Sequence, residues 1–214
     1  PSTRSAVIKV DLTATDVALH FADIPISEDA ACALTKAANG RLSKIVITGQ
    51  NTVADAAVMA FADHSPHLRH LDVSSTYGRV TTVGIDYVSQ KCPLLEYLDV
   101  SLTGGLVSDM AIAEVSRNCP NLLHLHVAGT EGKVTDASLQ HVARHCSQLR
   151  NLNVSRTSVS TAFSALHGGA MTDLGIRAIA SRCKHLRALD VSHTGGKVTD
   201  DSISVVAHSC PHLE

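Results

Sequence analysis

The side chains best equipped for chemistry in this chain are its cysteines and histidines. The 214 residues include six cysteines and thirteen histidines, enough to build a disulfide framework or a zinc site. Five of the cysteines follow one regular spacing: Cys92, Cys119, Cys146, Cys183 and Cys210. Each of them lies three residues before a leucine of an apolar pattern, so we expect reduced thiols that pack inward as small apolar groups. Cys32 falls outside this register. We predict neither a disulfide nor a metal site.

Two pairs of histidines have a spacing that suits ligand binding. His141 and His145 are four residues apart on a predicted helix, but two ligands are too few for zinc, and we favour a solvated helix face. His124 and His126 alternate along a predicted strand, so both point to its exposed side. His126 should neighbour Asp99, and a carboxylate favours the charged imidazole. The pair predicts either a patch with pH-dependent binding or an ordinary polar sheet surface.

The sequence contains no complete motif of a catalytic site. The phrase GGKVTD at 195–200 resembles part of a phosphate-binding loop. Such a loop needs a glycine five residues before Gly196, and Val191 occupies that position. The phrase also recurs as EGKVTD at 131–136, which marks it as part of a repeat. Serines near histidines show no nucleophile-elbow pattern. We predict no enzyme, no catalytic residues and no cofactor.

An internal repeat must position these side chains. The pattern L-x-x-L-x-V begins at five leucines: Leu68, Leu95, Leu122, Leu149 and Leu186. The first three steps are 27 residues long, and the last is 37, which implies a ten-residue insertion. Weaker copies begin at Leu42 and Val7. A period of this length is typical of proteins built from stacked repeats.

Each unit predicts a short strand followed by an amphipathic helix. Leu125 and Val127 alternate on one face of a strand. Thr135 and Asp136 then supply side-chain oxygens for the free N–H groups at a helix start. The helix over 136–145 carries one apolar stripe. A single unit cannot bury both apolar faces, so we expect units to stack, with parallel strands on one side and helices on the other.

The repeated pattern C-P-x-L-x-x-L-x-V-S-x-T-x-x-x-V-T-D resembles the cysteine-containing leucine-rich repeat over nearly the whole chain from about residue 39. That subclass occurs in F-box/LRR proteins, the substrate receptors of Skp–cullin–F-box ubiquitin ligases, and in scaffold proteins that include axonemal ones. The resemblance implies an α/β fold, a right-handed leucine-rich-repeat solenoid of the ribonuclease-inhibitor type. Its parallel strands would line the concave face and its helices the convex face. The implied function is either substrate recognition in a ubiquitin ligase, with the adaptor bound outside this chain, or a structural or cytoskeletal scaffold without a ligase role.

The repeat pattern divides the chain into three segments. Residues 1–38 are expected to form an atypical N-terminal repeat, with an inserted loop over 16–25. Residues 39–209 contain the leucine-rich repeats, and the ten-residue insertion lies near 158–170. Residues 210–214 are expected to begin a further, truncated repeat.

Two surfaces are candidates for binding protein partners. The first is the exposed strand face, with Tyr97 as its aromatic anchor, because aromatic residues are enriched among binding hot spots. Its candidate residues are His70, Asp72, Tyr97, Asp99, His124, His126, Asn151 and Asn153. The second consists of the inserted loops, since insertions in repeats often emerge on the binding face. Its candidates are Phe21, Phe163 and Leu166. The alternative is that these loops cap the solenoid and bury their phenylalanines.

Composition excludes other classes of partner. The net charge of -2 lacks the basic excess of a nucleic-acid-binding surface. No apolar run approaches the length needed to cross a membrane. An aromatic share of 3%, with no tryptophan, indicates one aliphatic packing arrangement used repeatedly. Reduced thiols predict that the protein is located in the cytoplasm or the nucleus. Association with the cytoskeleton is left open.

Overall fold

The chain folds as a solenoid in which parallel strands alternate with helices. The computed structural model describes residues 17–22, 26–49, 54–157 and 171–214. Within these ranges, seven strands form one parallel sheet in the order β1 to β7, and seven helices alternate with them. The strands are β1 (Val17–Ala22), β2 (Leu42–Thr48), β3 (His70–Asp72), β4 (Tyr97–Asp99), β5 (His124–His126), β6 (Asn151–Asn153) and β7 (Ala188–Asp190). The helices are α1 (Glu28–Ala38), α2 (Asp55–Asp63), α3 (Thr82–Lys91), α4 (Asp109–Asn118), α5 (Asp136–His145), α6 (Asp173–Arg182) and α7 (Asp200–Ser209).

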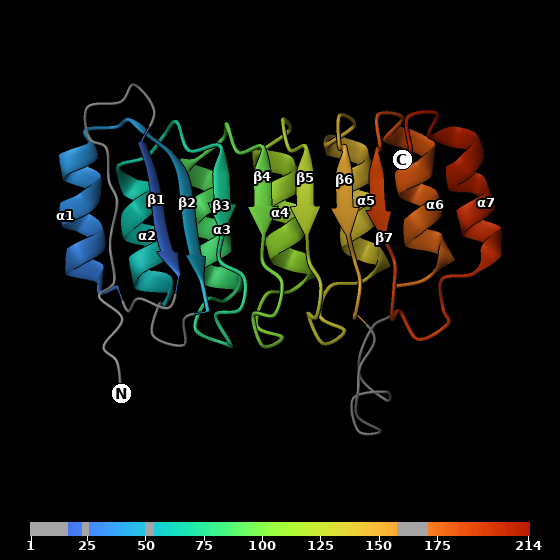
Figure 1. Cartoon of the computed structure of the whole chain (residues 1–214), viewed down its shortest axis with the longest axis horizontal. Coiled ribbons are helices and arrows are strands. Elements are labelled where there is room, and N and C mark those ends of the chain that lie inside the picture. The colour runs from blue at the N-terminus through green and yellow to red at the C-terminus, as the bar shows by residue number, and fades with distance from the viewer. Residues whose placement is uncertain (1–16, 23–25, 50–53, 158–170) are drawn as a thin grey trace.

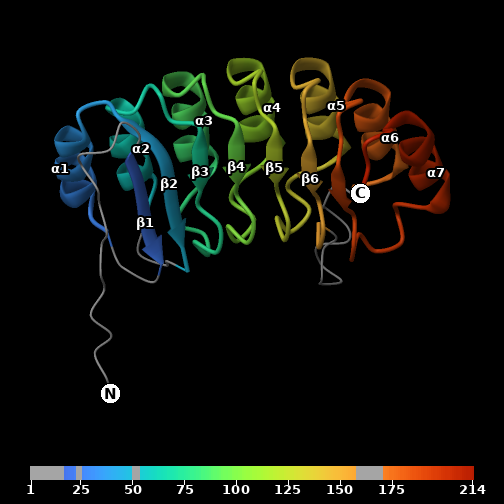
Figure 2. The same cartoon turned by 45° about the horizontal axis from the view of Figure 1, so that its top comes forward.

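All of these helices lie on one side of the sheet (Figure 1). Figure 2 shows the helices along the outer side of an arc and the strands along its inner side. The connections between strands are right-handed crossovers (Figure 1), as nearly all parallel connections are. The predicted α/β leucine-rich-repeat solenoid, with a concave sheet and a convex helical layer, is therefore confirmed. Among the described helices, none is both long and apolar enough to span a membrane.

The helix starts follow the predicted threonine–aspartate pattern and add a contact between units. Thr172 caps α6 by accepting a hydrogen bond from the backbone N–H of Leu174. The carboxylate of Asp136, at the start of α5, accepts hydrogen bonds from the backbone nitrogen of Thr172 at 2.8 Å and from its Oγ1 at 2.6 Å. We call this contact the Asp–Thr clamp. It recurs between three other pairs: Asp55 and Thr81, Asp109 and Thr135, Asp173 and Thr199.

The core is an aliphatic layer between the sheet and the helices. Leu98, Leu125 and Leu152 lie side by side in the central strands and are almost completely buried. Each strand is too short to fold alone, and burial of such side chains stabilises the stack by about 1.5–3 kcal/mol each. Stacking of the repeats therefore supplies the core that a single unit lacks.

The five in-register cysteines form a buried column along this core, as predicted. Each thiol also donates a hydrogen bond to a backbone carbonyl of the preceding unit. The Cys119 Sγ lies 3.5 Å from the carbonyl oxygen of Cys92, and the Cys146 Sγ lies 3.7 Å from that of Cys119. Burial raises the pKa of the Cys119 and Cys146 thiols to about 12, so both stay protonated and unreactive at neutral pH. Cys32, in α1, is half-buried.

The N-terminal unit departs from the sequence prediction. The loop expected over 16–25 is wrong for Val17–Ala22, because these residues form β1 and pair with β2. Leu19 and Phe21 are buried, whereas His20 is exposed on the opposite side of the strand. This alternation is itself a strand pattern. The weaker repeat near Val7, which the sequence predicted as the first strand, lies outside the described residues.

Candidate functional site

Two rows of side chains cover the concave face of the sheet. They come from alternate positions of each strand, because the aliphatic residues between them point into the core. The first row consists of Ala18, Lys44, His70, Tyr97, His124, Asn151 and Ala188. The second row consists of His20, Val46, Asp72, Asp99, His126, Asn153 and Asp190. The parallel register thus brings the eight strand residues singled out in the sequence onto one surface.

Four aromatic rings gather in the middle of these rows. The rings of His70 and Tyr97 are stacked, with centroids 3.8 Å apart and an interplanar angle of 8°. On the next strand, the His124 ring lies 5.8 Å from that of Tyr97, and the His126 ring lies 5.2 Å from it. We call these four residues the aromatic ladder. Imidazoles flank Tyr97 on both neighbouring strands, so its ring is held between other rings of the sheet surface.

His126 also contacts a carboxylate, as the sequence predicted. Its Nδ1 lies 3.3 Å from Oδ2 of Asp99 on β4. Burial would raise the pKa of Asp99, but hydrogen bonds from His126 and Ser101 outweigh it and hold that pKa below its usual value. Asp72, one strand away, has the opposite shift, because burial raises its pKa above the usual value. The contact with His126 therefore makes Asp99 the more firmly ionised of the two carboxylates.

Two imidazoles of the aromatic ladder are uncharged at neutral pH. The pKa of His70 is lowered to about 4, chiefly by burial and further by the nearby Lys44 and His20. The pKa of His124 also lies below its usual value, because of burial and then the neighbouring His126. A neutral imidazole offers one N–H donor and one nitrogen acceptor. The ladder can therefore exchange hydrogen bonds in both directions with a partner.

The second row has a structural role that the sequence did not reveal. Four of its members accept a hydrogen bond of 2.8 to 2.9 Å from the backbone N–H of the serine two residues later: Asp72, Asp99, Asn153 and Asp190. Such bonds hold the turn that follows each strand. His126 lacks a side-chain oxygen, and the backbone nitrogen of Ala128 donates instead to Ser101 Oγ at 3.2 Å. The His126 side chain is thereby free to contact the neighbouring strand.

Of the three binding candidates in the inserted segments, the structure describes Phe21 alone. Phe21 has no exposed surface, and its ring packs against that of Phe61 with centroids 5.9 Å apart. Its predicted binding role is therefore wrong, and Phe21 belongs to the core. Phe163 and Leu166 lie outside the described residues. Sequence reasoning missed His20 on the concave face because it placed this segment in a loop, although the alternation in VALHFA indicated a strand.

The concave face has shallow, open grooves beside the aromatic ladder. One of about 270 Å³ is lined by His126, Asn153 and Asp190, among others.

On the helical side, the rings of His141 and His145 are stacked with centroids 6.4 Å apart. Within the part of the chain that the structure describes, no group of three or more histidine, cysteine, aspartate or glutamate side chains is placed to hold a metal ion. The geometry suits surface recognition better than chemistry in an enclosed pocket.

Comparison with known proteins identifies the fold. No family model matches this chain, and no curated protein matches it in sequence. Among solved structures, it is similar to a chain in the crystal structure of the Rad7 and Elc1 complex from yeast. The TM-score is 0.71 at 16% sequence identity, and the match covers 92% of this chain and 48% of the other. This chain therefore shares a leucine-rich-repeat-like solenoid with that protein and spans about half of its length.

Proposed function

We propose that this chain is a non-enzymatic, protein-binding solenoid of the cysteine-containing leucine-rich-repeat subclass. In this proposal it is the substrate-recognition region of an F-box/LRR-type protein in a Skp–cullin–F-box ubiquitin ligase. The observation that carries the proposal is the aromatic ladder on the concave sheet. Side chains with an apolar body and a polar tip are enriched at protein interfaces, and stacking on short strands holds these rings in place before a partner binds.

The chemistry of the ladder favours a polypeptide as the partner. His70 and His124 are neutral and carry both donors and acceptors, whereas Asp99 and Lys44 add one charge of each sign beside them. A polypeptide presents amide donors, carbonyl acceptors and charged side chains in the same mixture. Nucleic acid would instead favour a basic surface, and the whole chain has a net charge of -2.

The ligase part of the proposal has two supports. The first is the repeat of about 27 residues over 39–209, with its buried column of thiols. The second is the likeness in fold to a protein that was solved in a complex with a second protein. This chain covers only part of the length of that protein, so we place the adaptor-binding region outside this chain. Thiols that stay reduced in the core suit the cytoplasm or the nucleus.

Affinity purification of the full-length protein from its own cells tests both parts. We expect a Skp-type adaptor to copurify with the wild type and with a Tyr97→Ser/His124→Ser double variant. A substrate protein should copurify with the wild type only. The matched control is His185→Ser/His212→Ser, which removes another stacked pair of rings, 6.3 Å apart, away from the concave rows. This control should retain both the adaptor and the substrate.

Each part of the proposal can fail separately. An unchanged set of partners in the Tyr97→Ser/His124→Ser variant would contradict recognition by the concave face. Copurification of microtubule or flagellar proteins without any adaptor would contradict the ligase assignment and support the structural scaffold instead. Circular dichroism of each variant shows whether the helices and strands are intact.

A further inference from the structure

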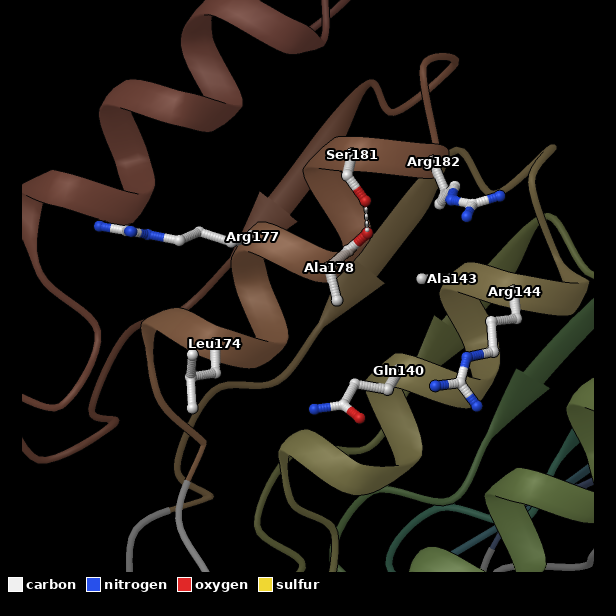
Figure 3. A pocket seen from close by; sticks show the side chains of 8 residues that line it. All are labelled: Gln140, Ala143, Arg144, Leu174, Arg177, Ala178, Ser181 and Arg182. Carbon is white, nitrogen blue, oxygen red and sulfur yellow. Dashed lines mark hydrogen bonds between the residues drawn. The ribbon is translucent and has the colours of Figure 1, made fainter.

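The convex face carries a second candidate surface, a groove between α5 and α6. The groove has a volume of about 350 Å³, and Figure 3 shows the side chains around it. Ala143 and Ala178 face each other across its floor, and Gln140 and Leu174 lie toward one end. The Leu174 side chain is 68% exposed. The groove is therefore partly apolar, although it lies on the solvent side of the helical layer.

The groove opens because one helix position carries a smaller residue in α6 than in its neighbours. Ala178 is the sixth residue of α6, and the sixth residues of the three preceding helices are larger: Tyr87, Glu114 and His141. The Tyr87 side chain, for example, reaches from α3 to the end of α2, where its hydroxyl donates a hydrogen bond to Asp63 at 2.5 Å. A single methyl group at this position leaves the space between α5 and α6 unfilled.

The same helix positions explain why the groove is cationic. Arg117, the ninth residue of α4, pairs with Glu114 three residues earlier. Arg144 is the ninth residue of α5, but His141 replaces the glutamate there. Among the described residues, no carboxylate pairs with Arg144 or with Arg182 at the end of α6. Two guanidinium groups thus line the groove without a described counter-ion.

The other polar groups of the groove do not neutralise these arginines. Arg177 extends toward α7 (Figure 3) and lies 3.7 Å from Asp201. The Ser181 hydroxyl donates to the carbonyl oxygen of Ala178 at 2.7 Å. The sequence over 158–170, which connects β6 to α6, contains no aspartate or glutamate. The charge of Arg144 and Arg182 therefore remains available to an anionic partner.

We propose that this groove docks an acidic segment of a partner protein. Carboxylate side chains of the segment pair with Arg144 and Arg182, because the planar guanidinium matches a carboxylate through two parallel hydrogen bonds. Apolar side chains between those carboxylates pack on Ala143, Ala178 and Leu174. The apolar floor favours a polypeptide over a free inorganic anion. This binding surface lies on the opposite side of the solenoid from the aromatic ladder and does not depend on the function proposed for it.

Fluorescence anisotropy with a labelled peptide of alternating glutamate and alanine tests the proposal on the full chain. We expect saturable binding that weakens as salt rises, because exposed charges are screened. Arg144→Gln and Arg182→Gln should each weaken binding about threefold, and the double variant about tenfold. The control Arg117→Gln removes the arginine at the same helix position of α4, which already has a partner, and should leave affinity unchanged.

A second variant tests the shape of the groove. Ala178→Tyr introduces the residue that α3 carries at this position, so the helix should fold while the groove is filled and peptide binding is lost. Wild-type affinity in Ala178→Tyr, or in the double arginine variant, would overturn the proposal. Tighter binding of an oligothymidylate of equal charge, or of inorganic phosphate, would also overturn it. Loss of peptide binding in Tyr97→Ser/His124→Ser would place the peptide on the concave face and equally contradict it.

Discussion

At the scale of single residues, position in the repeat decides what a side chain does. His70 is a neutral member of a stacked ladder, His126 contacts a carboxylate, and His141 takes the place of a glutamate on a helix. Asp99 holds both a turn and an imidazole, whereas Asp136 clamps two units together. The residue type alone does not distinguish these roles, because each depends on the neighbour one repeat away.

His70 should make the stability of the protein depend on pH. Its pKa is about 4 in the folded chain against 6.5 for an unperturbed histidine, so the unfolded state binds the proton first as the pH falls. The stabilising contribution is complete above about pH 6.5 and is lost progressively down to about pH 4. We expect His70→Gln to flatten this part of the curve, as measured by urea unfolding at several pH values between about 7 and 4.

The control for this experiment is Asn151→Gln, which changes a side chain in the same row but removes no titrating group. Its unfolding free energy should follow the same pH dependence as that of the wild type. An identical slope in His70→Gln and the wild type would contradict the neutral state that we assign to His70.

At the scale of the elements, strand and helix are joined to the next unit by repeated contacts of two kinds. The leucine and cysteine positions pack the interior, and the Asp–Thr clamps tie the helix starts together along one rim. From α2 to α7 the series has one exception, since α3 begins with Thr82 instead of aspartate. Its Oγ1 lies 3.0 Å from Ser108 Oγ, so a pair of hydroxyls replaces the carboxylate between α3 and α4.

Asp136→Ala should destabilise the fold by about 1–3 kcal/mol. The substitution leaves three donors without their acceptor: the backbone nitrogen and Oγ1 of Thr172 and the backbone nitrogen of Gly175. Thr82→Ala removes the uncharged counterpart, in which Thr82 Oγ1 contacts Ser108 Oγ and accepts a hydrogen bond of 3.1 Å from the Ser108 backbone nitrogen. It should cost about 1 kcal/mol or less, because hydrogen bonds between uncharged groups are weaker than those to a carboxylate. Urea unfolding of both variants measures the difference. Equal losses would mean that the clamp contributes no more than a neutral hydroxyl pair.

Leu125→Ala and Cys119→Ala compare the two parts of the interior. Both side chains are completely buried, but leucine loses three carbon atoms and leaves a larger cavity. We expect a loss of about 2–5 kcal/mol for Leu125→Ala and a mild loss for Cys119→Ala, whose thiol is small and makes a weak hydrogen bond. Thermal and urea unfolding of the two variants give the comparison. A Leu125→Ala protein with the melting temperature of the wild type would contradict the packing described for β5.

At the scale of the whole molecule, burial is uneven along the solenoid. Helix α4 buries five residues, whereas α7 buries Ser202 and Val206. Leu189 of β7 and Val191 directly after it are also only partly buried, although their counterparts Leu125 and Val127 are inaccessible. In a stack of repeats, each unit is stabilised mainly by its neighbours. Within these 214 residues, α7 is therefore held by fewer buried side chains than α4.

Amide hydrogen exchange should report this gradient. We expect the amides of α7 to exchange faster, with a lower opening free energy, than those of α4 and α5, because local unfolding begins where fewest apolar contacts are lost. Exchange followed by NMR or mass spectrometry on these 214 residues alone resolves the helices separately. Equal protection of α4 and α7 would show that the solenoid opens as one cooperative unit.

The sequence by itself determined the repeat, the alternation of strand and helix, the buried thiols and the membership of the two concave rows from β3 to β6. Each of these follows from spacing within one unit, where apolar periodicity fixes which face is buried. Strand β1 was not predicted from the sequence, because the repeat is weak there and Leu19 and Phe21 fall within an apparent loop.

Apart from the predicted contact of His126 with Asp99, only the tertiary structure decided which side chains from different units touch. The stacked rings of His70 and Tyr97, the clamp between Asp136 and Thr172, and the groove above Ala178 all join residues at least 27 positions apart, or depend on the size of such neighbours. Lateral contact depends on strand register, rotamer and side-chain volume at once. The pattern of one unit predicts the row in which a residue lies, and the packed neighbours determine what the residue does there.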